Sequence, residues 1–388
     1  MSEAKQMHRD LMNALLSILP RKVYGDIRRV ANLVWAIVGL CLTQTVRLEA
    51  WSEILECRAK YAASRVRRFA RFLHNRAIDP KEWYKPLIQS VLKEWPSNMH
   101  LYIALDTTAL TPFVLIRISL IYRGRAIPLA WRAIVHASTK VSFADYQPVL
   151  DQVVTLIPEG MVVTLLADRG FVQEELFHYA RTRHWHIRLR LPCNTIVHLP
   201  HRTPCQVREL CPPLGHASFF HNSALLGTTI APLHLAVALP EDQPDDPWYV
   251  VSDEPTDLHT FDEYGLRFDI EETFLDEKSG GFQLESSELA TPDALERLVL
   301  ILAIATIHFT SIGLEVVQAK VRRFVDTHWD RGLSYLKIGW RWLRQCYRQG
   351  WQLFSPFWLD PTPDTIPVIP SRRSADWPKR QWIVPLLC

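Results

Sequence analysis

Residues 101–106 read LYIALD, an apolar run that ends in an aspartate, and residues 161–168 repeat the pattern as MVVTLLAD. Short apolar runs of this kind predict two buried strands, closed by Asp106 and Asp168. Side chains at the ends of neighbouring strands can meet at one edge of a sheet, so the two carboxylates are a candidate metal pair. Either aspartate alone is more simply explained as a turn or cap residue, and only the pair suggests a site.

The flanking sequence predicts the rest of the sheet. Two β-rich runs, 113–122 and 126–134, are joined by Arg-Gly-Arg, which is a hairpin signal. Helical patterns over 143–156 and 172–184 alternate with the strand 161–167 and a further strand, 186–191. The order of three strands, helix, strand, helix, strand predicts an α/β (α+β) fold, a mixed sheet with helices packed on it. Residues 192–255 are rich in proline and short β-like runs, which predicts a β-rich insertion.

The charges are unevenly distributed along the chain. Residues 1–98 carry 17 Lys/Arg and 9 Asp/Glu, residues 99–317 carry 15 and 27, and residues 318–388 carry 12 and 5. Basic ends around an acidic centre suggest a nucleic-acid binder with carboxylates at its middle, and therefore a need for cations between the carboxylates and the DNA.

The composition excludes several classes of protein. Hydrophobic residues make up 48% and charged residues 22% of the 388, which is ordinary for a globular protein. Seven cysteines without a regular pattern favour a reducing compartment, and the polar residues 1–10 do not resemble a secretory signal. The apolar run 298–314 is short for a membrane span and contains His308, so we expect a buried helix and no membrane association.

The segment 58–74 combines helical spacing of apolar residues with an outer face of arginines and lysines. No acidic residue occurs between Glu56 and Asp79, which favours contact with DNA through residues such as Arg65 and Arg68. A solvated surface helix explains the same pattern, and the sequence leaves both interpretations open.

A third carboxylate occurs in the segment 264–278, YGLRFDIEETFLDEK. At about 100° per residue, Tyr264, Arg267, Glu271 and Lys278 lie within an arc of about 60°, whereas Glu272 lies outside it. Surface ion pairs would account for the charged residues but not for the tyrosine in the same stripe.

These four residues match Y-x2-R-x3-E-x6-K, and the chain thereby resembles DDE-class bacterial insertion-sequence transposases of the insertion-sequence-four-like superfamily. LYIALDTTAL around Asp106 and LLADRGF around Asp168 resemble the blocks that carry the first two catalytic carboxylates of that family. The resemblance covers about residues 100–345. It implies a ribonuclease-H-like domain and a DNA transposase, an endonuclease and strand transferase that acts by cut-and-paste DNA recombination. The domains expected are a helical DNA-binding domain at 1–97, a catalytic domain at 98–191 and 256–317, the insertion at 192–255, a basic helical region at 318–354, and a proline-rich extended tail without a firm core at 355–388.

The resemblance also implies roles for individual residues. Asp106, Asp168 and Glu271 would be the catalytic residues and hold two Mg²⁺ ions, for which Mn²⁺ would substitute. Residues expected to contact DNA are Tyr264, Arg267 and Lys278 near the phosphates, Trp248 as a base-stacking residue, and Arg331, Lys337 and Arg341 in the C-terminal block. Trp248 could instead be a core residue, and the sequence leaves both roles open. The cations of the C-terminal block could instead form a basic surface over a packed aromatic core, and this alternative is open too.

Partners implied by the resemblance are transposon-end DNA and target DNA, with a homodimer in the DNA complex, and the expected location is the bacterial cytoplasm at the nucleoid. Two alternatives remain: a catalytically inactive DNA-binding repressor or scaffold, and a ribonuclease-H-like nuclease without strand transfer. The cysteines and histidines of the insertion lack the regular spacing of a zinc site, so zinc there is a weak hypothesis.

Overall fold

The fold was obtained as a computed structural model, which describes residues 2–225, 230–278, 281–349, 351 and 357–367. Its centre is one mixed sheet of the strands β1–β10, in the order β3-β2-β1-β4-β5-β10-β9-β8-β6-β7. β1 pairs antiparallel with β2 and parallel with β4, and β4 pairs parallel with β5. The predicted mixed sheet with packed helices is therefore confirmed.

The elements of this part of the sheet have the bounds β1 His100–Leu110, β2 Phe113–Tyr122, β3 Arg125–Val135, α7 Phe143–Val154, β4 Val162–Ala167, α8 Glu174–Thr182 and β5 His186–Arg190. β1 runs past Asp106 because its second half forms a hairpin with β2, in which Asp106 pairs with Arg117. The expectation that Asp106 closes its strand is therefore wrong, whereas Asp168 does follow the end of β4.

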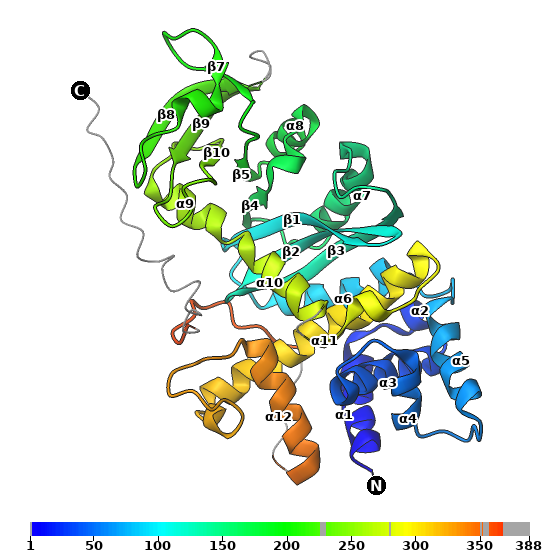
Figure 1. Cartoon of the computed structure of the whole chain (residues 1–388). Helices are drawn as coiled ribbons and strands as arrows, with labels where there is room; N and C mark the ends of the chain where they lie inside the picture. The colour runs from blue at the N-terminus through cyan, green and yellow to red at the C-terminus, as the bar shows by residue number, and fades with distance from the viewer. Residues whose placement is uncertain (1, 226–229, 279–280, 350, 352–356, 368–388) are drawn as a thin grey trace.

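The β-rich insertion continues the same sheet. Its strands are β6 Ile196–His198, β7 Cys205–Gln206, β8 Ala217–Leu225, β9 Ile230–Ala238 and β10 Trp248–Ser252. β10 pairs antiparallel with β5, so the insertion extends from the β5 side of the strands β1–β5, at the upper end of the molecule in Figure 1.

Among the residues that the structure describes, six α-helices precede the sheet and four follow the insertion. The first six are α1 Glu3–Ile18, α2 Arg21–Tyr24, α3 Ile27–Thr43, α4 Leu48–Ile54, α5 Ala62–Leu73 and α6 Pro80–Lys93, and the later four are α9 Leu258–Gly265, α10 Phe268–Glu277, α11 Pro292–Gln318 and α12 Tyr335–Gln349. Most of the N-terminal and C-terminal helices share one apolar core with the sheet, whereas α9 packs with β8, β9 and β10 in a second, smaller cluster.

Helix α11 is the centre of that core and lies between the sheet and the N-terminal helices (Figure 1). By length and composition, α11 is apolar enough to cross a membrane, but 94% of its apolar window is buried inside the protein. The pair α3 and α4, which is bent by 98°, would meet the same criterion only if both helices formed one span. The buried helix expected for 298–314 is confirmed. Arg297 on α11 donates to the carbonyls of Leu73 and Ile78, which attaches the end of α5 to the core.

Helices α11 and α12 cross at very short range because each has a glycine at the crossing. A Cβ on Gly313 would lie 1.9 Å from the carbonyl oxygen of Tyr335, and one on Gly339 would lie 1.8 Å from that of Phe309. Trp340 stacks on Phe309 beside this contact, with ring centroids 5.9 Å apart. The basic aromatic region around α12 is therefore part of the core.

The described part of the proline-rich tail also packs on the protein. Leu359 is buried and its carbonyl accepts a hydrogen bond from the indole of Trp95, while Asp360 pairs with Arg123. The expectation of a tail without a packed core is wrong for residues 357–367, although these form neither helix nor strand. Residues 368–388 lie outside the described part of the chain.

Candidate active site

Asp106 and Asp168 lie side by side at two neighbouring parallel strands. The register of β1 with β4 pairs Leu105 with Ala167, and the next residue in each segment is an aspartate, Asp106 within β1 and Asp168 directly after β4. The Asp106 side chain is only 15% exposed, and its Oδ1 accepts a hydrogen bond from the Thr107 amide at 2.8 Å. Asp168 Oδ1 is buried and accepts no hydrogen bond from the residues that the structure describes. Two acidic groups therefore share a largely buried edge, and one has an oxygen without a partner.

Helix α10 brings Glu271 to the same place through an arginine. Arg267 Nη2 donates to Glu271 Oε1 at 2.6 Å, and its Nη1 lies 3.4 Å from Asp106 Oδ2. The guanidinium is 5% exposed, whereas the Glu271 side chain is 47% exposed. Arg267 therefore connects the first and the third predicted carboxylates.

The three carboxylates do not share one ion-sized cage in this state. Asp106, Asp168 and Glu271 are not among the described groups of three whose ligand atoms all lie within 4.8 Å of one another. Arg267 lies between Asp106 and Glu271 and holds them by its two terminal nitrogens.

Burial and neighbouring carboxylates make Asp106 a weaker acid than an ordinary aspartate. Burial is the main cause that raises the pKa of Asp106 to about 6, with Glu271 and Asp168 adding to the effect and Arg267 opposing it. Burial alone would lower the pKa of Arg267, but Tyr264 and the three carboxylates raise it, so the arginine stays charged. Three carboxylates against one guanidinium leave a local excess of two negative charges when all are ionised.

These features fit a divalent cation. Carboxylate oxygens are the ligands that Mg²⁺ and Mn²⁺ prefer, the unpartnered Asp168 oxygen offers one, and the excess charge matches a cation. Glu271 is exposed enough to exchange its arginine partner for an ion.

The expected stripe on one helix is divided between two helices. α9 ends at Gly265 and α10 begins at Phe268, so Tyr264 and Arg267 flank a break, and the Arg267 guanidinium lies 5.8 Å from the centre of the Tyr264 ring. Lys278 follows the end of α10, where its Nζ donates to Ala109 O at 3.2 Å. Since Ala109 is three residues beyond Asp106, Lys278 lies about 10 Å along β1 from the carboxylates.

Tyr264 and Trp248 are both fully buried. Their rings are 5.4 Å apart, and each also contacts Phe268 in a small apolar cluster under α9 and α10. In this structure neither ring has a surface that a phosphate or a base could reach, because the helices cover both. Of the two roles that the sequence left open for Trp248, the core position is the one found here. Tyr264 is not accessible in this structure, so its contact with DNA stays a prediction.

The C-terminal cations have internal partners. Arg331 is 1% exposed, pairs with Asp364 at 2.6 Å and contacts the tail, so it is not accessible in this structure and its contact with DNA stays a prediction. Lys337 pairs with Asp276 at 2.7 Å on α10, and Arg341 donates to Val325 O while remaining exposed. Of the three, Arg341 has the most accessible side chain.

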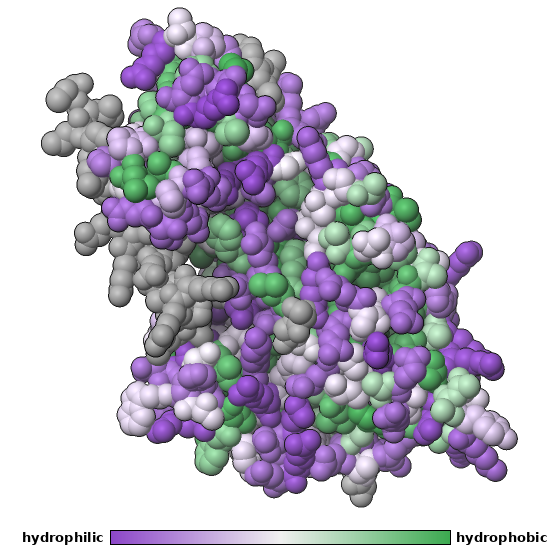
Figure 2. Space-filling view, viewed as in Figure 1, coloured by the Kyte–Doolittle hydropathy of each residue, from purple (hydrophilic) through white to green (hydrophobic). Residues whose placement is uncertain are grey.

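On helix α5 the accessible cations differ from those chosen by sequence. Arg65 and Arg68 are half-buried, and Arg68 donates to Asn32 at 2.6 Å. Arg67 and Arg71 are exposed. Helix α5 lies at the right of Figure 1, and hydrophilic side chains project on that side in Figure 2. The phase of the helix decides this, because Phe69 and Phe72 turn inward and leave positions 67 and 71 outward.

Sequence reasoning missed the residues that hold Glu271 in place. Arg117 on β2 and Glu277 on α10 form a fully buried ion pair at 2.7 Å, and Thr273 accepts a hydrogen bond from Ala126 of β3. A charged residue within the apolar run 113–122, FVLIRISLIY, is the signal that could have revealed the pair. Together these contacts fix α10 across the β2–β3 hairpin.

Comparison with known proteins finds a similarity in fold but no family. No protein-family model and no curated protein matches the chain. A solved structure described as "Cryo-EM structure of piggyBac transposase synaptic complex with hairpin DNA" is similar to it at 13% sequence identity and a TM-score of 0.42, over 97% of this chain and 88% of that chain. A similarity of this size assigns no family to the chain.

Proposed function

We propose that this chain is a DDE-type DNA transposase of the bacterial insertion-sequence-four-like kind, which cleaves at insertion-sequence ends and joins the freed 3′-hydroxyl to target DNA. The observation that carries the proposal is the placement of Asp106 on β1 beside Asp168, which directly follows the parallel strand β4, with Glu271 tied to Asp106 by Arg267. Three carboxylates from distant parts of the chain at one sheet edge are what a two-metal phosphoryl-transfer site requires.

Asp106, Asp168 and Glu271 would hold two Mg²⁺ ions, with Mn²⁺ as a substitute. When bound, such ions activate a water molecule or a 3′-hydroxyl as the nucleophile and stabilise the leaving oxygen of the phosphodiester. Strand transfer exchanges one phosphodiester for another, so the joining step needs no nucleotide cofactor.

The protein's own residues position the DNA and balance its charge. Arg267 is charged, desolvated and next to the carboxylates, so it is placed to pair with a phosphate once Glu271 has turned to a cation. Tyr264 lies beneath Arg267 and would hold its guanidinium in place rather than touch DNA. Lys278, about 10 Å along β1, would contact a neighbouring phosphate.

Two basic surfaces would extend the contact with DNA. Arg67 and Arg71 are exposed on α5, and Arg341 is exposed on α12. Transposon ends and target DNA would be the partners, and joining two ends requires two active sites, hence a homodimer on DNA. A protein with this function would need access to chromosomal DNA, so we propose the bacterial cytoplasm, at the nucleoid, as its location.

A second candidate is a catalytically inactive DNA-binding protein. It is favoured by one observation, that Arg267 rather than a shared ion separates Asp106 from Glu271. A nuclease without strand transfer is the third possibility.

One assay separates the three. The full chain is incubated with labelled DNA that carries the repeats flanking its gene, a supercoiled target and Mg²⁺, and the products are run on a denaturing gel. Nicks at the repeat ends together with joined strands are expected. Nicks without joined strands would indicate a nuclease, and binding without nicks in Mg²⁺ or Mn²⁺ would overturn the enzyme assignment.

A further inference from the structure

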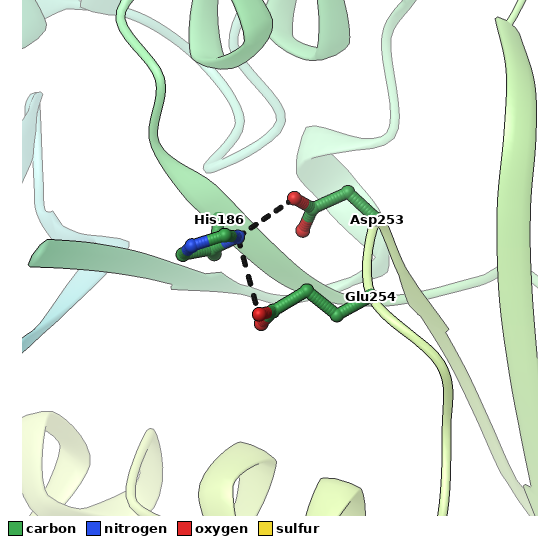
Figure 3. Close-up of side chains that lie close together, drawn as sticks. All are labelled: His186, Asp253 and Glu254. Atoms are coloured by element: carbon green, nitrogen blue, oxygen red, sulfur yellow. Dashed lines mark hydrogen bonds and ion pairs between the residues drawn. The ribbon is translucent and has the colours of Figure 1, made fainter.

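A second group of candidate ligands lies away from the three carboxylates, where the insertion joins the catalytic strands. His186 begins β5, and Asp253 and Glu254 directly follow β10 (Figure 3). His186 Nδ1 lies 2.8 Å from Asp253 Oδ2 and 3.5 Å from Glu254 Oε2. Among the described residues, this is the group of three whose ligand atoms all lie within 4.8 Å of one another.

The backbone and neighbouring side chains hold these ligands in place. Asp253 Oδ1 accepts a hydrogen bond from the Ile187 amide at 2.8 Å, which leaves Oδ2 directed at the imidazole. The Glu254 amide donates to Ser252 Oγ at 2.9 Å, and Arg188 Nη2 pairs with Glu254 Oε2 at 2.8 Å. Ligands that are held by second contacts of this kind need little reorganisation to bind an ion.

The local charge is unbalanced in the direction that favours a cation. Arg188 contacts the carboxylates of Asp253, Glu254 and Glu263. Three ionised carboxylates against one guanidinium leave two negative charges in excess, and a neutral His186 adds none. A divalent cation would balance this charge.

Room for further ligands is present on one side. A cavity of about 320 Å³ is lined by His184, His186 and Asp253, together with residues of α8, and it opens to solvent. Each ligand side chain is between 31% and 41% exposed, so an ion could enter and keep bound water.

We propose that His186, Asp253 and Glu254 form a binding site for a divalent transition-metal ion of the zinc class. One imidazole nitrogen and two carboxylate oxygens suit Zn²⁺ better than Mg²⁺, which prefers an all-oxygen shell. The site is structural: an ion bound here clips the start of β5 to the end of β10. It therefore fixes the point from which the chain leads into α9 and on to Arg267 and Glu271.

The test is a metal titration of the full chain after removal of bound metal by a chelator. Millimolar Mg²⁺ is kept present to occupy the three catalytic carboxylates. Zn²⁺ binding is measured by competition with a chromogenic chelator, and Co²⁺ binding by its visible absorption bands. We expect one site per chain and a higher Tm with Zn²⁺, since an ion that binds only the folded state stabilises it.

The variants His186→Ala and Asp253→Asn should weaken Zn²⁺ binding at least tenfold and remove the Tm increase. Asp253→Asn retains an oxygen that can accept from the Ile187 amide, so it separates loss of the ligand from loss of folding. His178→Ala is the matched control, because His178 is exposed and pairs with Glu174 at 3.3 Å without a third ligand. The proposal would be overturned if the parent protein bound no Zn²⁺. It would also be overturned if the variants bound Zn²⁺ as tightly as the parent does, which is the result expected if the cysteines of the insertion held the ion instead.

Discussion

The buried pair of Arg117 and Glu277 gives the sharpest test of how helix α10, which carries Glu271, is held in place. Their side chains are 0% and 2% exposed, and Arg117 also covers the ring of Phe274 at 4.1 Å. Arg117→Met preserves the stem but leaves the Glu277 carboxylate buried without its partner. Breaking a pair of this kind costs about 3–5 kcal/mol of unfolding free energy, a large share of the roughly 5–15 kcal/mol that is usual.

The double replacement Arg117→Met with Glu277→Met is the matched control. Arg117 Nε and Nη2 are buried and make no hydrogen bond within the described part of the chain, so the native pair is incompletely compensated. Replacing both charges by apolar side chains should therefore restore stability to within about 1 kcal/mol of the parent. Urea unfolding followed by circular dichroism measures all three proteins.

The pH dependence supplies a second readout for the same variants. Burial raises the pKa of Glu277, and Arg117 opposes that rise. In Arg117→Met the opposing charge is gone, so the folded-state pKa lies still further above the unfolded value. The folded state then binds a proton that the unfolded state does not, and the variant regains stability as the pH falls from 8 to 5. A single variant that costs less than about 1 kcal/mol, or a double variant no better than the single, would refute the reasoning.

Three further predictions concern the site. Glu271→Gln should abolish end cleavage while Glu272→Gln keeps it, as a gel assay of both variants would show; the reverse pattern would mean that the helix register is wrong. Because burial raises the pKa of Asp106 to about 6, protons should compete with Mn²⁺ for this carboxylate below that pH. The affinity for Mn²⁺, measured by calorimetry on a His186→Ala variant that lacks the second site, should therefore drop between pH 7 and pH 5. Equal affinities at the two pH values would contradict this. Trp248→Ala should lower the unfolding free energy by about 3–5 kcal/mol because the ring is fully buried, whereas a near-neutral change would point to a functional rather than a packing role.

Local pattern was enough to predict much of the sheet. The hairpin of β2 and β3, strand β4 with Asp168 after it, and the buried helix α11 all follow from apolar runs and turn residues close together in sequence. Their formation depends on neighbours within a few residues, which is the range over which periodicity carries information.

Long-range pairing could not be predicted in the same way. That β10 would pair with β5 depends on residues about 60 positions apart, and no local pattern specifies it. The burial of Arg331 depends on Asp364 in the tail, so a residue typical of a DNA contact is instead an internal ion pair. For Tyr264, helical spacing gave the right neighbour, Arg267, but the break after Gly265 and the packing on Trp248 decided that the ring is buried.

The central claim is that Asp106, Asp168 and Glu271 together bind divalent cations, and crystals grown with Mn²⁺ test it most directly through anomalous scattering. The account predicts Mn²⁺ peaks within bonding distance of Asp106 and Asp168, with Glu271 turned away from Arg267 towards the ions. Crystals in which Mn²⁺ is absent from this edge, with Arg267 still holding Asp106 and Glu271, would contradict it.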